Sequence, residues 1–170
     1  FGDWSPKTYC PPGTYATGFS LMIEASCVGD CDDTALNGIR LICSGAIDIA
    51  PTSIESGHRA WGVWHPVKNC PPGEALFSYS LGLEHYLGGG QDDTSANSLK
   101  MKCRKVGTYD TPEPELAIHG PFADTWTSWG KCPVNSVVIG LLTRDEKSQG
   151  TGDDTATNDV MFICARRRSA

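Results

Sequence analysis

Pairs of acidic residues followed by threonine and asparagine are the clearest candidates for chemistry in this sequence. The motif Asp-Asp-Thr-x-x-Asn occurs three times, at residues 32–37, 92–97 and 153–158. Neighbouring carboxylates suit a hard cation such as calcium, and they can also accept hydrogen bonds from sugar hydroxyls. Asp, Thr and Asn side chains equally bond nearby backbone N–H groups and fix turns. Because a feature repeated identically three times serves the fold more often than a ligand, we favour the structural role and predict no bound metal ion.

A glutamate precedes each aspartate pair, at Glu24, Glu84 and Glu146. Such a glutamate and an aspartate could act as the general acid and base of a glycosidase, which needs two carboxyl groups roughly 5–9.5 Å apart with separated pKa values. Three equivalent copies argue against one privileged pair, and no Ser–His–Asp or Cys–His nucleophile pattern occurs. We therefore assign no catalytic residue and expect no cofactor.

Aromatic residues precede each copy of the motif. A flat indole ring can stack on the C–H face of a sugar, which leaves a carbohydrate-binding interpretation open. Repeated aromatic residues in strands more often lie in the core, where each buries about 150–250 Å², and we favour that placement. The residues are Phe1 and Trp4, Trp61 and Trp64, and Trp126 and Trp129.

The eight cysteines divide into three repeated pairs and one extra pair. A cysteine lies ten residues after the second aspartate of every motif, and another lies 22 or 23 residues before it. If equivalent copies fold alike, three disulfides join Cys10 to Cys43, Cys70 to Cys103, and Cys132 to Cys164. Cys27 and Cys31 have no counterparts, so we expect them to bond each other. The alternative, that both stay free, is disfavoured in an oxidising compartment.

Hydrophobic residues alternate with others in two segments of each copy, for example at residues 19–23 and 39–43. A period of two predicts strands with one buried face, and no segment shows a helical period. The tryptophan segments are expected to add a third strand per copy, and the stretches after residues 43 and 103 a fourth. We predict one all-β domain, residues 1–170, with three sheets around a pseudo-threefold axis. The three repeats are about 1–56, 57–120 and 121–170.

Three segments carry a resemblance to a known family. They are Asp-Asp-Thr-Ala-Leu-Asn-Gly-Ile-Arg-Leu at 32–41, Trp-Gly-Val-Trp at 61–64 and Glu-Lys-Ser-Gln-Gly at 146–150. Here, and over nearly all 170 residues, the sequence resembles the vitelline membrane outer layer protein I family. The resemblance implies three Greek-key sheets in a β-prism I fold, secretion, and association with extracellular coats such as the egg envelope. It also implies an oligosaccharide-transferring activity on N-acetylglucosamine polymers as an alternative.

Composition narrows the classes of partner. The net charge of −6 argues against nucleic acid and anionic membranes, since both need a basic surface. No run of 18 apolar residues occurs, so we predict no membrane insertion. Cysteines at this density suit an oxidising compartment. The chain begins without methionine or a signal peptide, as expected of a mature, secreted product.

The three copies differ most between the glutamate and the aspartate pair, at residues 25–31, 85–91 and 147–152. Loops at one end of a threefold prism should lie together, which brings the glycine run 88–90 beside carboxylates. An acidic pocket of this kind favours neutral or cationic sugars over sulfated ones. The residues that we expect to contact a ligand are Glu84, Asp92, Asp93 and Asp153.

These observations favour a secreted, disulfide-stabilised structural component of an extracellular coat, of the egg-envelope or mucus type, with weak glycan binding. Its expected partners are extracellular glycans or coat glycoproteins. Two alternatives stay open: a carbohydrate-active enzyme acting on N-acetylglucosamine oligosaccharides, and a lectin with a defined sugar site. Turnover of chitooligosaccharides separates the enzyme from either binder, and a glycan array separates the coat protein from the lectin.

Overall fold

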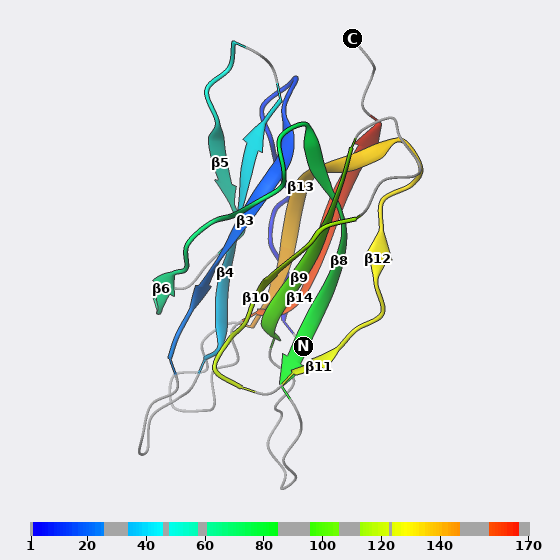
Figure 1. The fold of residues 1–170 in the computed structure, drawn as a ribbon. Helices are drawn as coiled ribbons and strands as arrows, with labels where there is room; N and C mark the ends of the chain where they lie inside the picture. Colours follow the sequence, from blue (N-terminus) through cyan, green and yellow to red (C-terminus); the bar gives the residue numbers. More distant parts are fainter. Residues whose placement is uncertain are drawn as a thin grey trace, which may run out of the picture.

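The chain folds into three antiparallel β-sheets (Figure 1). The computed structural model describes residues 2–25, 34–45, 48–57, 61–84, 96–105, 113–122, 124–146 and 157–166. Within these residues the structure has strands and turns but no helix, as the period of two predicts. Accordingly, nothing in the described part of the chain is a helix long and apolar enough to cross a lipid bilayer.

Each sheet is built around a long hairpin. The first sheet contains β3 (Tyr15–Ile23), β4 (Leu36–Ser44), β5 (Thr52–Glu55), β6 (Val63–Trp64) and β7 (Lys68–Asn69). The second contains β8 (Glu74–Glu84), β9 (Ala96–Lys105), β10 (Glu115–Ile118), β11 (Asp124–Trp126) and β12 (Gly130–Lys131). The third contains β13 (Ser136–Asp145), β14 (Thr157–Arg166), β1 (Asp3–Trp4) and β2 (Thr8–Tyr9).

The strand order gives the first two sheets a Greek-key topology. The orders are β5-β4-β3-β6 and β10-β9-β8-β11, with β7 also pairing with β3 and β12 with β8. The fourth strand thus lies beside the first strand of its own sheet. In the third sheet that place is taken by β1 and β2, which both pair with β13. The beginning of the described chain therefore completes the sheet formed by its end.

One bulge occurs at the same place in all three long hairpins. The register shifts between Ala16 and Gly18 and at the corresponding places in β8 and β13. The carbonyl of the extra residue accepts a backbone N–H from a cysteine at 2.7 Å each time. These three bonds run from Cys10 to Ile139, from Cys70 to Thr17 and from Cys132 to Phe77.

Three disulfides follow the same threefold pattern. They join Cys10 to Cys43, Cys70 to Cys103, and Cys132 to Cys164, which are the pairs that the spacing predicts. Because the first cysteine of each pair also bonds the bulge of the preceding sheet, each bridge fastens the junction between two sheets. The fourth predicted pair, Cys27–Cys31, lies outside the described residues.

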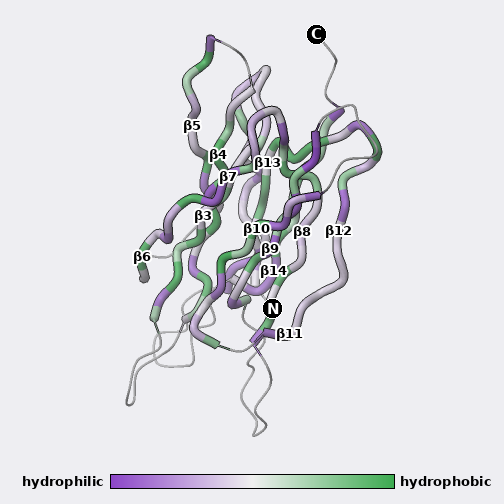
Figure 2. The backbone as a smooth tube through the Cα atoms, viewed as in Figure 1, coloured by the Kyte–Doolittle hydropathy of each residue, from purple (hydrophilic) through white to green (hydrophobic). Residues whose placement is uncertain are grey.

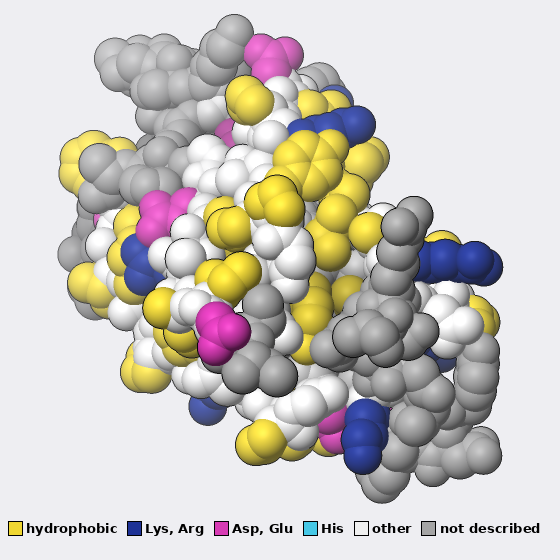
Figure 3. All heavy atoms as spheres, turned by 90° about the horizontal axis from the view of Figure 1, so that it is seen from above, with side chains coloured by type: hydrophobic (Ala, Val, Ile, Leu, Met, Phe, Trp, Pro, Cys, Tyr) yellow, Lys and Arg dark blue, Asp and Glu magenta, His cyan; other side chains and the backbone are white. Residues whose placement is uncertain are grey.

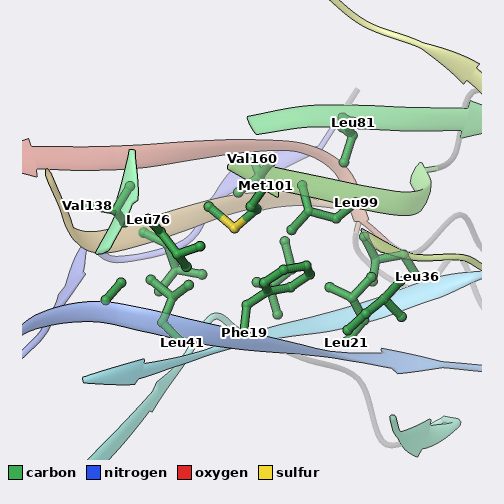
Figure 4. Packing of buried hydrophobic residues seen from close by; sticks show 14 of the residues in the cluster. Phe19, Leu21, Leu36, Leu41, Leu76, Leu81, Leu99, Met101, Val138 and Val160 are labelled. Carbon is green, nitrogen blue, oxygen red and sulfur yellow. The ribbon is translucent and has the colours of Figure 1, made fainter. Parts of the chain in front are cut away.

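The core lies between the inner faces of the three sheets. Phe19, Leu21 and Leu41 from the first sheet point toward Leu99 and Met101 from the second (Figure 4), and all five are fully buried. Val138 and Val160 close the cluster from the third sheet. Figure 2 shows how hydrophobic residues recur along the central strands. Seen along the prism, hydrophobic side chains occupy the middle and most Lys and Arg side chains the periphery (Figure 3).

The third sheet is the most open one. β5 and β10 cover the outer edges of β4 and β9, whereas no described strand pairs with the corresponding edge of β14. Cys164 is accordingly half-buried, while its equivalents Cys43 and Cys103 are fully buried. On that edge the carboxylate of Asp159 accepts the N–H of Val160 at 2.8 Å. A charged side chain on an exposed edge strand opposes pairing with another chain.

Tyr79 links the second and third sheets, and we predict that it titrates late. Its ring packs edge-on against Phe162 with the centroids 4.9 Å apart. Burial, and secondly the nearby Asp159 carboxylate, raises the pKa of the Tyr79 hydroxyl above its ordinary value near 10. The folded state therefore holds this proton more tightly than the unfolded state. The resulting stability is complete below about pH 10 and is lost as the pH rises further. In an absorbance titration at alkaline pH, Tyr79→Phe should remove a phenol that ionises above pH 10; an unchanged curve would contradict the assignment.

Candidate functional site

The structure describes only part of the predicted ligand site. Glu84 is the last residue of β8 and is partly buried. Asp92, Asp93 and Asp153 lie outside the described residues, as does the glycine run 88–90. The described part of the predicted site is Glu84 and the strands on either side of these segments.

The three repeated glutamates lie at one end of the prism. β3, β8 and β13 run in the same direction and end at the same end of the molecule (Figure 1). Glu24 follows β3, Glu84 ends β8 and Glu146 follows β13. We call this end, from which the three variable segments leave the strands, the loop end. The disulfides lie toward the opposite end, because Cys43, Cys103 and Cys164 are near the ends of the returning strands.

The glutamate, threonine and asparagine of the first copy hold its hairpin together. The Thr34 hydroxyl donates a hydrogen bond to Glu24 Oε2. Asn37 Nδ2 donates to the carbonyl and the hydroxyl of Thr34 at 3.2 and 2.9 Å, and the Glu24 N–H bonds the Ala35 carbonyl at 3.0 Å. Glu24, Thr34 and Asn37 thus connect the ends of β3 and β4 in the first copy, while Asp32 and Asp33 lie outside the described residues.

The asparagine of the second copy holds a longer connection. Buried Asn97 donates through Nδ2 to the Phe122 carbonyl and to Asp124 Oδ1, both at 2.7 Å. Its Oδ1 accepts the Phe122 N–H at 3.3 Å. Asn97 thus fixes the link between β10 and β11 and places the Asp124 carboxylate beside β8.

Asp124 is a departure from the threefold pattern. The equivalent residues in the other copies are Gly2 and Gly62, at φ +97° and +105°, where a Cβ would approach a backbone oxygen to 2.6 Å. Across the sheet, Gly82 replaces Met22 and Arg144 of the other copies, and a Cβ on Gly82 would lie 2.5 Å from Asp124 Oδ1. In the second copy, aspartate thus replaces the glycine of one strand and glycine replaces the larger residue of the other. The missing side chain at position 82 leaves room for the Asp124 carboxylate.

Four more side chains lie on the same part of the sheet as this carboxylate. His119 Nδ1 lies 3.4 Å from Asp124 Oδ2, and the imidazole meets Trp126 edge-on with centroids 5.7 Å apart. The ammonium of Lys100 lies 4.0 Å above the Trp126 ring. Glu84 is directly opposite Asp124 in the strand register. We call Glu84, Lys100, His119, Asp124 and Trp126 the loop-end cluster.

The loop-end cluster has the chemistry of a polar small-molecule site. The Asp124 side chain is 8% exposed and the His119 side chain 58%, so the carboxylate is fixed while the imidazole reaches solvent. A partly exposed indole beside hydrogen-bonding groups offers a sugar both a stacking face and partners for its hydroxyls. No group of three His, Cys, Asp or Glu side chains in the described residues is arranged to hold a metal ion.

Sequence reasoning missed His119 and Asp124 and misplaced the tryptophans. The favoured placement of Trp in the core is wrong: Trp4 and Trp61 are 37% and 61% exposed, and Trp64, Trp126 and Trp129 are partly exposed. The inner faces are already filled by Leu, Ile, Phe and Met. The indoles therefore lie on the outer faces. Asp124 had one detectable signal, namely an acidic residue where the other two copies have glycine.

Comparison with solved structures defines the class of fold. Calystegia sepium agglutinin matches over 98% of both chains with a TM-score of 0.51 and 12% identity. The Calsepa lectin in complex with a biantennary N-glycan gives a TM-score of 0.53 at 12% identity, again over 98% of both chains. An artocarpin–mannotriose complex gives 0.50 at 15% identity, over 96% of this chain and 97% of that one. This is a β-prism protein.

Sequence comparison defines the family. A profile described as vitelline membrane outer layer protein I matches residues 1–167. The vitelline membrane outer layer protein 1 homolog of Homo sapiens is 35% identical over 167 residues, covering 98% of this chain and 78% of the relative. The Mus musculus homolog is 33% identical over 165 residues, covering 96% and 78%. The chain belongs to the vitelline membrane outer layer protein I family, and this membership together with the disulfides indicates an extracellular protein.

Proposed function

We propose that the chain is a secreted, disulfide-stabilised structural component of an extracellular coat, of the egg-envelope or mucus type, that binds glycans weakly at the loop end of its second sheet. The family supports the coat role, and three disulfides support an oxidising setting. Its proposed partners are extracellular glycans or coat glycoproteins.

The observation that carries glycan binding is the asymmetry of the loop-end cluster. Two of three copies complete the same fold with glycine at the position of Asp124. The carboxylate accepts a hydrogen bond from Asn97 in this copy, and its Oδ2 beside His119 is in position to accept a ligand hydroxyl as well. The artocarpin and Calsepa structures contain mannotriose and an N-glycan. Those sugars belong to those proteins, and they support testing this chain with oligosaccharides.

The proposed contacts extend from Glu84 to Asp92, Asp93 and Asp153 in the adjoining loops. Their carboxylates would favour neutral or cationic sugars at this end by charge repulsion of anionic ones. The glycine run 88–90 would allow a glycan backbone to approach closely. Bulky residues at 88–90 should weaken binding in a folded variant; unchanged affinity would remove this loop from the site.

Trp126→Ala should lower the affinity for chitohexaose about tenfold or more, because a buried aromatic contact is the kind of group that dominates binding energy. Trp64→Ala is the matched control. It removes the equivalent indole of the first sheet, which lies under Arg40, and in that copy Gly62 occupies the position of Asp124. Isothermal titration calorimetry measures both variants. Equal losses in the two variants, or none in Trp126→Ala, would contradict a site in the second copy.

A carbohydrate-active enzyme is the second candidate, and one observation favours it. Glu84 and Asp124 are neighbouring carboxylates on adjacent strands, and no equivalent pair exists in the first or third copy, where the partner is glycine. Most enzymes that cleave or transfer glycosides use two carboxyl groups, one as general acid and the other as base or nucleophile. Turnover of chitohexaose that is lost in Glu84→Gln and Asp124→Asn would favour the enzyme; binding without turnover would favour the coat protein.

A further inference from the structure

The outer face of the second sheet carries three cations, each stacked on an aromatic ring. Lys100 Nζ lies 4.0 Å from the centroid of Trp126, and Lys102 Nζ lies 4.3 Å from that of Trp129. The guanidinium carbon of Arg104 lies 4.4 Å from the centroid of Phe77. Since alternate residues of a strand share a face, the cations form one row along β9. We call these three pairs the cation–aromatic ladder.

The fold does not require the Lys102–Trp129 pair of the cation–aromatic ladder. Counting from the repeated cysteines, Lys102 corresponds to Ile42 in the first copy and Ile163 in the third. Trp129 likewise corresponds to Val67 and to Lys7. The same sheet is thus built twice without a lysine on an indole at this place, which separates the pair from the structural residues that recur in all copies.

The three cations of the cation–aromatic ladder differ in their hydrogen-bond and ion-pair partners. The Arg104 guanidinium donates to the carbonyls of Pro133 and Ser136 at 3.1 and 2.9 Å, so it fastens the start of β13. Lys100 lies 3.8 Å from Glu115 Oε1, a partly exposed pair. Glu115 is opposite Lys102 in the strand register, but its carboxylate pairs with Lys100. No carboxylate among the described residues lies within ion-pair distance of Lys102, so the charge of Lys102 is available to an external anion.

A further lysine lies in the same row across the sheet. Lys131 on β12 is opposite Ser78, which is opposite Lys102 on β9. Residues in register share a face, and neighbouring strands are about 4.8 Å apart. Lys131 and Lys102 therefore project from the same face with backbones roughly 10 Å apart, on either side of a serine whose hydroxyl donates to the Gly130 carbonyl at 2.8 Å.

We propose that this face binds the anionic groups, sulfate or carboxylate, of an acidic glycan, with Lys102 and Lys131 contacting the anions and Trp129 contacting a sugar ring. The inference extends the proposed glycan-binding function to a second, differently charged subsite. Glycan is favoured over nucleic acid because the net charge of −6 repels a densely charged polyanion at longer range, whereas a sparsely charged sugar chain meets only the local lysines.

The test replaces Lys102 and Trp129 by the corresponding residues of the first copy, which the same fold already accommodates. Lys102→Ile with Trp129→Val should weaken binding of a chondroitin sulfate hexasaccharide, or of oligosialic acid, about tenfold or more, and leave chitohexaose binding unchanged. The sulfated and sialylated probes decide which anion is preferred. Raising the salt from about 0.05 to 0.5 M should weaken binding of both probes, because the contacts are surface charges.

A second variant, which introduces the lysine and the tryptophan into the first sheet, tests the proposal if the Lys102→Ile, Trp129→Val variant folds poorly. Ile42→Lys with Val67→Trp introduces the pair into the first sheet and should increase the number of acidic glycans bound per chain. Unchanged binding of both acidic probes in the first variant, or equal binding of a short DNA duplex, would overturn the inference. The two proposals fail separately: Trp126→Ala reports on chitohexaose, and the Lys102–Trp129 variant reports on acidic probes.

Discussion

Replacing Cys70 and Cys103 together by alanine will lower the free energy of unfolding by about 3–4 kcal/mol. The bridge closes a loop of 33 residues, and the chain-entropy model gives a loss of that size when such a loop is opened. Cys70 also donates its N–H to the bulge of the first sheet. Opening the bridge therefore loosens the junction between two sheets. Urea denaturation followed by tryptophan fluorescence measures the change.

The bridge between Cys132 and Cys164 is the matched comparison. Its loop of 32 residues has nearly the same length, so an entropic mechanism predicts nearly the same loss. Cys103 is fully buried while Cys164 is half-buried. A packing mechanism therefore predicts a larger loss for the Cys70–Cys103 variant. A loss below about 1 kcal/mol in both variants would contradict the stabilising role of the bridges.

The hairpins and bridges could be predicted because their signals repeat. Phe19, Leu21 and Ile23 alternate along β3 as expected and are all buried, and the second strand of the copy is equally well defined by Ile39 and Leu41. A period of two reports which face is buried without any knowledge of the partner strands. Equal cysteine spacings in three copies then left one consistent pairing, which the structure contains.

The pairing of the short strands could not be predicted in the same way. β6, β7, β11 and β12 have two or three residues each, too few to show a period. Their partners lie in the sheet of the preceding copy, with β6 on β3 and β11 on β8. The outer-face position of the tryptophans in these segments could not be predicted either, because nothing local shows that Leu, Ile, Phe and Met already fill the inner faces.

The loop-end cluster could not be predicted from the features that the three repeats share. Asp124 and Gly82 together exchange two positions that the other copies fill with glycine and a larger residue. Lys102 and Trp129 likewise replace Ile42 and Val67. In a threefold chain, residues that recur describe the fold, and residues that depart from the recurrence in one copy identify candidate binding positions.

Removing residues 1–8 will destabilise the third sheet, by about 1.5–4.5 kcal/mol. β1 and β2 pair with the edge of β13, and Gly2 and Ser5 make three further hydrogen bonds to it. Ser5 N–H donates to the Thr143 carbonyl at 2.8 Å and Thr143 N–H to the Ser5 hydroxyl at 3.0 Å. Arg144 Nε donates to the Gly2 carbonyl at 3.0 Å. Each such bond contributes about 0.5–1.5 kcal/mol net.

Single substitutions and a synthetic peptide distinguish the loss of the pairing between residues 1–8 and β13 from a non-specific loss of stability. Ser5→Ala leaves the N–H of fully buried Thr143 without its partner and should cost about 1–3 kcal/mol. Thr127→Ala is the control in the second sheet, where the Thr127 hydroxyl accepts the Leu81 N–H at 2.9 Å. A synthetic peptide of residues 1–8 should restore stability to the shortened chain as its concentration rises, because it binds only the folded state. An unchanged unfolding midpoint in the shortened chain would mean that the third sheet holds together without its N-terminal strands.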